Sequence, residues 1–598
     1  MTIAPGPTEL IVDQAGRASR RMLAWMRDAG RGAAASVAVR PEDFTGGIVQ
    51  RLTAAFAQGI ADGVPVLLAG SYALADPVPP IDLTAGALTV VGGGDIHVTA
   101  DLGVAVTIQA PYAAVVPVTA IAATTRSFPG VATVATACVR ITAPGLGAAI
   151  GDVCKLVSDD QITPTSAANH RRGEHVYVAD VSGDDVFVAG PLLETYTTSP
   201  RIARLRRDAR LDWDGPTFSA MPGQAWGTTF LRARSLLQPS VRTGFRDGYA
   251  IGLDISSCVQ ADADVTGLQM LNRQASASIS GYLVQDSAST KSRVTVRGID
   301  ARHGYTTTTP TSGVGGSAYL YGRTVGSVVG GDFIATSSAA FDVHTEAVDV
   351  TFAQVTTSGG RLGEDASGAG IQMRGQRTRA IDCADRGSVN GLQFYAQVAG
   401  DCVDCSAVNF DYAGDGDAIR INSGGGINAV RPRVKGGLLR TTKSRTIVAW
   451  DCLDAILEDV LIAPLGSTSG AAGILLNGNA SVTVRRLTVD LRDWTGTTFR
   501  VFAFGGTGNS LYVESARLIN AAGKAQAWFN GGSTSGAASL GGLSGDAPSN
   551  VAINAGSVTL TLRDVIAGPF ADNAAAVSGG LAVGTPYRTA TGELRIVV

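Results

Sequence analysis

The chain has 598 residues, of which 75 are glycine and 17% are charged, and its formal net charge is −3 with a pI near 6.0. A chain so close to neutral has no overall basic field of the kind that drives binding to nucleic acid or anionic membranes, so we expect neither as a partner. A hydrophobic content of 45% argues against disorder, and the scarcity of 3.6-residue periodicity after Gln58 argues against a helical protein.

The N-terminal part predicts two helices followed by short strands. Residues 8–29 (TELIVDQAGRASRRMLAWMRDA) indicate an amphipathic helix after a short extended piece, and residues 46–63 (GGIVQRLTAAFAQGIADG) indicate a second helix with one apolar face. The opening MTIAPGPTEL lacks the basic start and the apolar stretch of a secretory signal, and no later run approaches the ~20 apolar residues of a membrane span. We therefore expect a protein made in the cytoplasm without membrane insertion.

Residues 101–196 read as strands separated by polar loops. The run HVYVADVSGDDVFVAGPLL (175–193) alternates on both sides of Asp184 and Asp185, which is typical of a β-hairpin. We interpret this region as a small inserted β domain without visible chemistry. The dense basic run 201–210 (RIARLRRDAR) is interleaved with apolar residues, which favours a half-exposed strand or linker over a nucleic-acid arm.

From Gly252 onward, pentapeptides of one pattern recur at intervals of roughly 21 to 36 residues, which is typical of a solenoid. They are GLDIS (252–256), YLVQD (282–286), AYLYG (318–322), AFDVH (340–344), GIQMR (370–374), GLQFY (391–395), AIRIN (418–422), TIVAW (446–450) and GILLN (473–477). Most are followed by a second alternating run and none by a helix. We therefore predict an all-β chain built on a right-handed parallel β-helix.

In each pentapeptide the second and fourth residues are mostly apolar, so they point into the core, and the third and fifth point outward. The outward positions place His344, Arg374 and Tyr395 in consecutive turns of the solenoid. We predict that these three residues are catalytic. A histidine base, an arginine beside a uronate carboxylate and a tyrosine acid are what a polysaccharide lyase needs.

The residues around these three predict a substrate-binding strip of amides, charges and an aromatic platform. Its members are Asp342, Gln372, Gln393, Arg420 and Trp450. A purely structural alternative stays open, since outward positions of any solenoid are polar and such side chains often only pair along an exposed ladder.

Other residues compete for the catalytic role. His303 in GIDARHGYTTTT could border the same groove or shape a turn. Two pairs of carboxylates could serve a glycosidase, or could simply form turns. These pairs are Asp415 with Asp417 in DYAGDGDAIRI, and Glu364 with Asp365 in GRLGEDASG. The pair Cys402 and Cys405 in DCVDC lacks a second pair at zinc spacing, and Cys383 matches Cys405 when the repeats are aligned. We interpret the cysteines as core thiols and predict neither a metal nor a cofactor.

Residues 46–94, a helix followed by VPVLLAGSYAL and VVGGGDIHV, resemble the start of the pectate-lyase-like β-helices of phage tailspikes. The segment from Gly151 (GDVCKLVSDD, RRGEHVYV, GPLLETY) resembles the β insertion of such tail proteins, ELIVDQAGRASRRMLAWM resembles a virion-attachment segment, and VGTPYRTATGELRIVV resembles a tail-protein C-terminus. The calcium-binding Asp cluster of pectate lyases and the Gly-His-Gly motif of polygalacturonases are missing.

The resemblance implies a division of the chain into attachment segment, solenoid and appendages. Its ranges are 1–40 (virion attachment), 41–104 (helix cap and start of the β-helix), 105–205 (β insertion), 206–245 (linker), 246–570 (parallel β-helix) and 571–598 (C-terminal segment). It further implies a homotrimer in the virion tail, assembled in the host cytoplasm and bound to tail or baseplate proteins through its N-terminus. The implied function is to bind a polysaccharide of the host surface, which is a capsule, lipopolysaccharide or exopolysaccharide, and to depolymerise it by lyase or glycosidase chemistry. The alternative to this function is a non-catalytic receptor-binding or structural tail protein.

Overall fold

The computed structural model describes residues 38–596 except for short internal gaps. The gaps are 85, 129–134, 166–169, 223, 225, 249, 271–280, 309–320, 336–337, 360–367, 424–425, 467–469, 497, 522–525, 533, 546–550, 555, 564–566, 582–585 and 590–593. The expected attachment helix at 8–29 lies outside the described residues. None of the helices in the described part of the chain is both long and apolar enough to cross a lipid bilayer.

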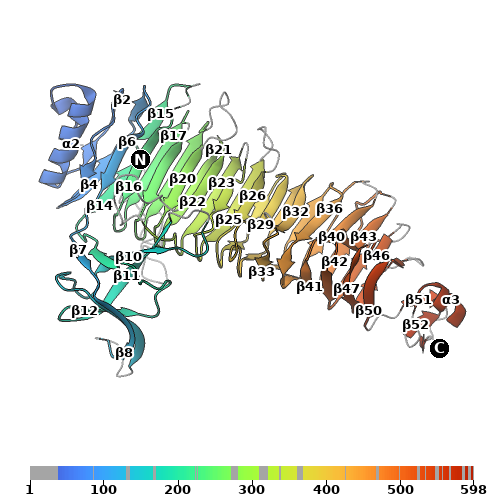
Figure 1. Cartoon of the computed structure of the whole chain (residues 1–598). Helices are drawn as coiled ribbons and strands as arrows, with labels where there is room; N and C mark the ends of the chain where they lie inside the picture. Colours follow the sequence, from blue (N-terminus) through green and yellow to red (C-terminus); the bar gives the residue numbers. More distant parts are fainter. Residues whose placement is uncertain are drawn as a thin grey trace, which may run out of the picture.

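A short 3-10 helix, η1 (Pro41–Asp43), and an α-helix, α2 (Ile48–Asp62), cover one end of an elongated stack of strands (Figure 1). Leu52 and Phe56 of α2 are fully buried, and the Phe56 ring centroid lies 6.3 Å from that of Trp213 in the first turns of the stack. The helix expected at 46–63 is therefore confirmed. It shields the apolar end of the solenoid, which would otherwise face water.

The stack consists mainly of two long parallel sheets, which we call the back sheet and the front sheet (Figure 1). The back sheet comprises β1 (Val66–Leu67), β2 (Ser71–Leu74), β4 (Ala87–Val91), β5 (Asp95–Val98), β14 (Arg210–Asp214), β15 (Thr217–Ala220), β17 (Ser240–Arg246), β19 (Asp262–Leu268), β21 (Arg293–Ala301), β23 (Val328–Ala335), β25 (Thr351–Gly359), β27 (Arg379–Ile381), β28 (Ala384–Asp385), β30 (Ser406–Val408), β31 (Asp411–Gly414), β34 (Arg433–Lys435), β35 (Leu438–Thr441), β38 (Ala455–Glu458), β39 (Leu461–Ile462), β41 (Ser481–Arg485), β42 (Leu487–Asp490), β44 (Asn509–Val513), β45 (Ala516–Ile519), β47 (Ser535–Leu540), β48 (Leu543–Gly545) and β50 (Ser557–Leu562).

The front sheet comprises β3 (Ile81–Asp82), β6 (Val104–Gln109), β16 (Thr229–Arg234), β18 (Ile251–Ser256), β20 (Tyr282–Ser287), β22 (His303–Thr308), β24 (Phe341–Val343), β26 (Ala369–Met373), β29 (Asn390–Ala396), β32 (Asp417–Ser423), β36 (Arg445–Trp450), β40 (Ala471–Asn477), β43 (Phe499–Phe504), β46 (Gln526–Asn530) and β49 (Val551–Asn554). A third line of parallel bridges, including β33 (Ala429–Val430) and β37 (Cys452–Leu453), joins successive turns between the sheets. The parallel β-helix predicted from the repeats is confirmed.

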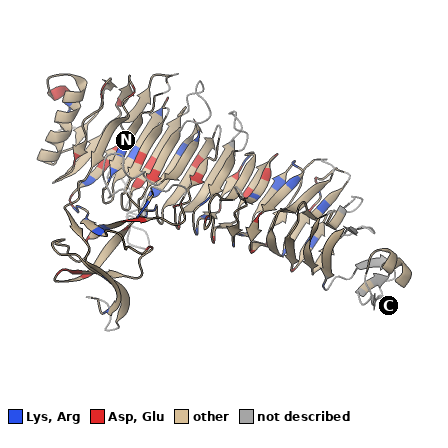
Figure 2. Cartoon of the chain, in the orientation of Figure 1, with Lys and Arg blue, Asp and Glu red and all other residues tan. Residues whose placement is uncertain are grey.

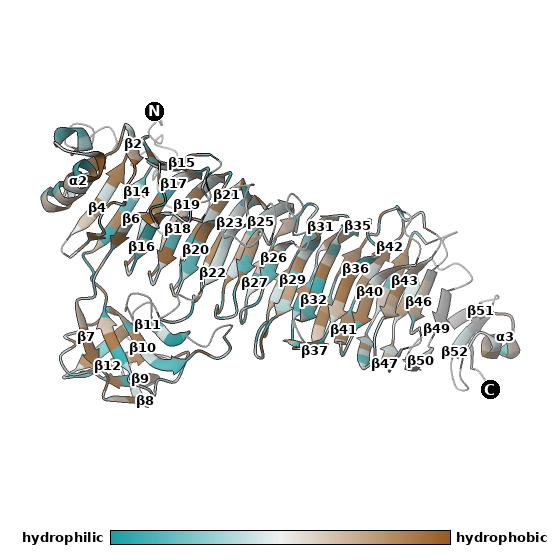
Figure 3. Cartoon of the chain, turned by 45° about the horizontal axis from the view of Figure 1, so that its top comes forward, coloured by the Kyte–Doolittle hydropathy of each residue, from teal (hydrophilic) through white to brown (hydrophobic). Residues whose placement is uncertain are grey.

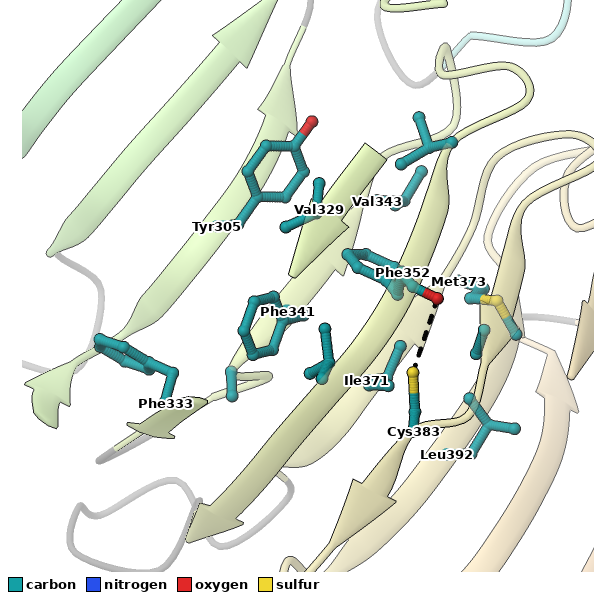
Figure 4. Close-up of a cluster of buried hydrophobic side chains, with 14 of the residues drawn as sticks. Tyr305, Val329, Phe333, Phe341, Val343, Phe352, Ile371, Met373, Cys383 and Leu392 are labelled. Carbon is teal, nitrogen blue, oxygen red and sulfur yellow. Dashed lines mark hydrogen bonds between the residues drawn. The ribbon is translucent and has the colours of Figure 1, made fainter. Parts of the chain in front are cut away.

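The core lies between the sheets and is continuous along the solenoid. Inward residues stack in register from turn to turn, for example Ile371 on Leu392 and Leu392 on Ile419. Figure 4 shows this packing around Phe341 and Phe352, whose rings meet edge to face at 5.8 Å. Figure 3 shows hydrophobic and hydrophilic residues alternating along the strands, as inward and outward positions require.

The sequence template was wrong at two turns. On β20, Val284 rather than Leu283 stands in register with the inward Leu253, so Asp286 points into the interior and Gln285 points outward. The turn that follows is β22 (His303–Thr308), whereas residues 318–320 of AYLYG lie outside the described residues and Tyr321 is in no strand. Both errors arise because β20 and β22 carry polar inward residues, which hide the apolar alternation.

One residue at a corner of each of several turns adopts a left-handed conformation, which bends the chain between sheets. Along one column these are Asp349, Arg377, Asp404 and Arg431, with φ between 52° and 58°. Arg377 binds Asp349 through two hydrogen bonds of 2.8 Å, and Arg431 binds Asp404 in the same way at 2.7 and 2.8 Å. These exposed ion pairs are matched one cation to one carboxylate.

All seven cysteines are free and buried, in agreement with core thiols. The expected register was wrong, however. Ile381 pairs with Val408 and Ser406 with Arg379, so Cys383 and Cys405 do not occupy equivalent positions. Cys402 and Cys452 instead share a column on the third side of the solenoid. Cys452 pairs with Ala429, and Val403, which follows Cys402, pairs with Val430, which follows Ala429.

The chain leaves the solenoid after β6 and returns at β14, and the segment between them folds into a separate antiparallel sheet with its own core (Figure 1). Its strands are β7 (Ala114–Pro117), β8 (Ala120–Arg126), β9 (Thr136–Thr142), β10 (Val153–Gln161), β11 (Arg171–Ser182), β12 (Asp185–Ala189) and β13 (Arg201–Arg204). The hairpin expected near Asp184 joins β11 to β12. The expected boundary at residue 105 lies within β6 rather than at its end. The segment 206–245, which was expected to be a linker, forms β14 to β17 of the solenoid. This expectation was wrong because the alternation in these strands resembles that of the insertion strands.

The insertion rests on the solenoid through buried polar contacts. The Lys155 ammonium donates to the Ala288 carbonyl at 3.0 Å, His175 Nδ1 lies 2.8 Å from Thr290 Oγ1, and His170 Nδ1 lies 2.7 Å from Glu346 Oε1. Burial lowers the pKa of Lys155 to about 7.

The solenoid ends at β50, which is earlier than the expected residue 570. A small unit follows, with α3 (Asn573–Ser578) and a sheet of β51 (Ala567–Phe570), β52 (Pro586–Thr589) and β53 (Leu594–Ile596). Strand β51 pairs with β52 rather than with the solenoid, so it belongs to this unit.

Candidate functional site

A column of polar residues runs along the outward face of the front sheet. Asp342 on β24 pairs with Gln372 on β26, Gln372 pairs with Gln393 on β29, and Gln393 pairs with Arg420 on β32. Neighbouring strands lie about 4.8 Å apart, so the column extends over about 14 Å. The register expected for the predicted strip is therefore present, and Val448 and Leu475 continue the column as apolar residues.

Asp342, at one end of this column, is fully buried. Its Oδ2 lies 3.0 Å from His344 Nε2, accepts a hydrogen bond from Arg374 Nη2, and lies 3.4 Å from Thr306 Oγ1. Burial alone would raise the pKa of the Asp342 carboxyl, but the Arg374 guanidinium and the His344 imidazole hold it well below its usual range. The carboxylate therefore stays charged and fixes both neighbours.

His344 and Arg374 extend from the buried carboxylate to the surface. The His344 side chain is 29% exposed and that of Arg374 is 13% exposed. The His344 backbone N–H donates to Thr307 Oγ1 at 2.8 Å, and Arg374 Nη1 donates to Gln397 Oε1 at 3.1 Å. Because Nε2 of His344 contacts Asp342, the other ring nitrogen, Nδ1, is left without a hydrogen-bond partner among the described residues.

Tyr395 lies on β29, beside Arg374 at the end of β26, and is half-buried. Its phenol makes no hydrogen bond to another described residue, and its neighbour on β32 is Asn422. The three residues predicted as catalytic thus lie on neighbouring strands, but only His344 and Arg374 are coupled, through Asp342.

An amide ladder fills the middle of the strip. Gln372 Nε2 donates to Gln393 Oε1 at 2.9 Å, and Gln393 Nε2 donates to Asn422 Oδ1 at 2.8 Å. Trp450, at the end of β36, stands next to Asn477 and is 41% exposed, which leaves much of its ring free for an apolar sugar face. Amides and an exposed indole are suited to hydroxyl groups and C–H faces.

His303 lies on β22 rather than in a turn and is buried beneath the strip. Its Nδ1 is in contact with the Ala339 carbonyl, and its ring lies 5.0 Å from that of Tyr282. Burial lowers the pKa of His303 to about 4, although Asp342 opposes this shift, so the imidazole is neutral near pH 7. A buried neutral imidazole supports the strip but does not face a ligand.

The carboxylates that were expected to act in pairs, Asp415 with Asp417 and Glu364 with Asp365, are not placed as pairs in the described structure. Asp415 is exposed in the turn before β32, whereas Asp417 is fully buried at the start of that strand, and Glu364 and Asp365 lie outside the described residues. Asp417 is surrounded by Lys443, Arg445 and Arg420. Sequence reasoning missed Lys443 and Arg445. The signal that could have found them is the pair of basic residues in KSRTIVAW, at the start of the strand that pairs with β32, which carries Asp417.

Within the described residues, no three His, Cys, Asp or Glu side chains are grouped so that they could hold a metal ion. The arrangement around Asp342 can hold an imidazole in a fixed orientation at the surface, which is what proton transfer requires.

No protein-family model matches the chain. Among solved structures, the chain is similar to the tailspike protein gp49 of Pseudomonas phage LKA1 (13% identity, 85% of this chain and 77% of that one, TM-score 0.43). It is also similar to the Gp54 tailspike of Acinetobacter baumannii bacteriophage AP22, solved in complex with an A. baumannii capsular saccharide (12% identity, 84% and 80%, TM-score 0.47), and to the Agl-KA catalytic domain (9% identity, 72% and 90%, TM-score 0.34).

Proposed function

We propose that the chain is a phage tailspike that binds a host surface polysaccharide on the outward face of the front sheet and depolymerises it. The observation that carries the proposal is the coupling of His344 and Arg374 through the buried Asp342, in register with a ladder of amides. A buried charge is costly unless it is paired, and the Asp342 carboxylate is paired with both His344 and Arg374.

In the proposed reaction His344 removes the proton next to a uronate carboxylate, and Tyr395 protonates the leaving glycosidic oxygen. The C–O bond breaks as a C=C bond forms, so the product is an unsaturated sugar and no oxidant is consumed. Asp342 keeps the imidazole oriented through its contact with Nε2. Its own burial and pairing exclude it as a nucleophile, and this favours elimination over the hydrolysis that two substrate-facing carboxylates would perform.

Incubation of the purified chain with polysaccharide from its host tests the proposal. Absorbance from an unsaturated uronate indicates a lyase, and new reducing ends without that absorbance indicate a hydrolase. Binding without any cleavage would discard the catalytic part of the proposal.

A non-catalytic receptor-binding protein is the second candidate. It is favoured by the internal pairing of the strip, where Gln372, Gln393 and Asn422 bond one another and the Arg374 charge is neutralised by Asp342. Such a surface holds a sugar chain without needing to react with it.

The proposal includes a homotrimer in the virion tail, attached to tail or baseplate proteins through residues 1–40 and assembled in the host cytoplasm. Support for self-association comes from the back sheet, where Leu268, Ile299 and Ile334 stand in register on β19, β21 and β23 and are each about 40% exposed. Adjacent exposed aliphatic side chains are typical of a surface that is covered in the assembly.

A further inference from the structure

A cluster of basic side chains lies next to the amide ladder on the front sheet. It consists of Arg420 on β32 and Lys443 and Arg445 at the start of β36, gathered around Asp417, and we call it the basic cluster. Arg420 continues the outward column directly after Gln393. Figure 2 shows basic residues on the strands in this part of the sheet.

The basic cluster has more positive than negative charge. Asp417 Oδ1 lies 3.1 Å from Lys443 Nζ and 3.6 Å from Arg445 Nε, and Asp417 Oδ2 lies 3.9 Å from Arg420 Nη1. One carboxylate therefore faces three cations, and a net charge of about +2 remains. The corner pairs Arg377–Asp349 and Arg431–Asp404 show no such excess among their described partners.

Burial divides the roles within the cluster. Asp417 is completely buried, while the side chains of the three cations are 26% to 37% exposed. The carboxylate thus lies underneath and fixes the cations, which present their remaining hydrogen-bond donors outward. The cations are held in place before any ligand arrives, so less side-chain entropy is lost on binding.

The inner side of the cluster is held by ion pairs alone. The buried Nε–H groups of Arg420 and Arg445 and both oxygens of Asp417 make no hydrogen bond within the described part of the chain. The partly exposed guanidinium and ammonium groups therefore keep donors for a ligand, and a planar carboxylate can accept from guanidinium groups in a two-pronged geometry.

We infer that the basic cluster is a binding site for the carboxylate of an acidic sugar unit, and this inference rests on the proposed polysaccharide function. The site adds specificity to the strip, because its excess charge favours a uronate-type unit over a neutral sugar of the same shape. The basic cluster begins on β32, the strand that also carries Asn422 of the amide ladder, and extends to the start of β36, so it binds a unit next to the one that contacts Gln393.

Saturation-transfer NMR titrations of the full chain with methyl β-glucuronoside and methyl β-glucoside test the inference, since these probes differ only in the carboxylate. We expect the glucuronoside to bind the wild type at least ten-fold more tightly than the glucoside, and the double variant Lys443→Gln/Arg445→Gln to abolish this difference. The charge-conserving Lys443→Arg should keep it, and so should Arg431→Gln, which removes a cation from an exposed corner. The single variant Lys443→Gln, expected to lose part of the preference, serves if the double variant does not fold.

Equal affinity for both probes, or an unchanged preference in the Lys443→Gln variants, overturns the inference. Displacement of the glucuronoside by an equal concentration of inorganic phosphate overturns the assignment to a carboxylate. Cosedimentation of the same samples with host polysaccharide separates the two proposals: a wild type that binds the polysaccharide but shows no glucuronoside preference rejects only the acidic-sugar site, and no polysaccharide binding by the wild type rejects the proposed function.

Discussion

Asp342 and His344, separated by one residue at the end of β24, are joined through a contact of 3.0 Å between Oδ2 and Nε2. The carboxylate is buried and the imidazole is partly exposed, so a charge fixed in the interior orients a group at the surface. Arg374 from the next strand binds the same oxygen, and this links neighbouring turns of the solenoid.

Replacing His344 by Gln should reduce the cleavage of host polysaccharide by a factor of about 10² to 10⁴, the usual contribution of a positioned acid or base. Glutamine keeps a polar contact with Asp342, so binding of the polymer should change little. The rate is measured from unsaturated uronate absorbance or from reducing ends. His97→Gln, on the back sheet, is the matched control and should cleave normally; unaltered turnover in His344→Gln would remove His344 from the mechanism.

Asp342→Asn should lower the free energy of unfolding by about 3 kcal/mol, because it leaves the largely buried Arg374 without its counter-charge. Since the pKa of Asp342 is held below its usual range, this stabilisation is fully present above about pH 4 and is lost as the pH falls through the lowered value. Thermal unfolding of wild type and variant from pH 3 to pH 8 measures it.

Asp349→Asn is the control for that measurement, since it breaks a pair with Arg377 on an exposed corner. We expect a loss below about 1 kcal/mol there. Equal losses in both variants would show that burial of Asp342 does not decide its contribution.

Asp286→Asn should stabilise the solenoid at neutral pH. Asp286 is buried and accepts hydrogen bonds from Tyr305 at 3.1 Å and Ser327 at 2.9 Å, and burial raises its pKa to about 6. Between about pH 4 and pH 6 the folded chain therefore binds more protons than the unfolded chain, and stability falls as the pH rises. The asparagine removes this slope and should add about 3 kcal/mol at pH 7; an unchanged slope of unfolding midpoint against pH would contradict it.

Trp450→Ala should weaken polysaccharide binding several-fold without altering the fold, because the residue is 41% exposed at the end of β36 and is not part of the hydrophobic core cluster. Cosedimentation or calorimetry with the host polymer measures the change. Tyr512→Ala is the matched control, since Tyr512 is an aromatic residue of similar exposure on the back sheet. An equal effect of both variants would argue against a platform at Trp450.

Leu268→Glu together with Ile299→Glu should convert a trimer into monomers, because charges at these adjacent positions oppose burial of the back-sheet column. Light scattering coupled to gel filtration gives the mass. Leu453→Glu, at an exposed position outside the column, should leave it unchanged. A wild type that is already monomeric, or a double variant that remains trimeric, would exclude this interface.

The repeated pentapeptides were enough to predict the parallel β-helix and most of its register, because alternation with a period of two residues is a local property that a strand must obey. The sequence therefore placed Asp342, Gln372, Gln393 and Arg420 in one column without further information. It failed on β20 and β22, where Asp286 and His303 replace apolar core residues and their hydrogen bonds come from other turns.

What the tertiary structure alone decided is which polar side chains are paired and which face solvent. The burial of Asp342 and Asp417, the cations that surround each of them, and the docking of the insertion through Lys155 depend on groups from different turns or domains. Such contacts leave no periodic trace in the sequence, because the electrostatic energy of a charge depends on its distance to partners in space and on the loss of water around it.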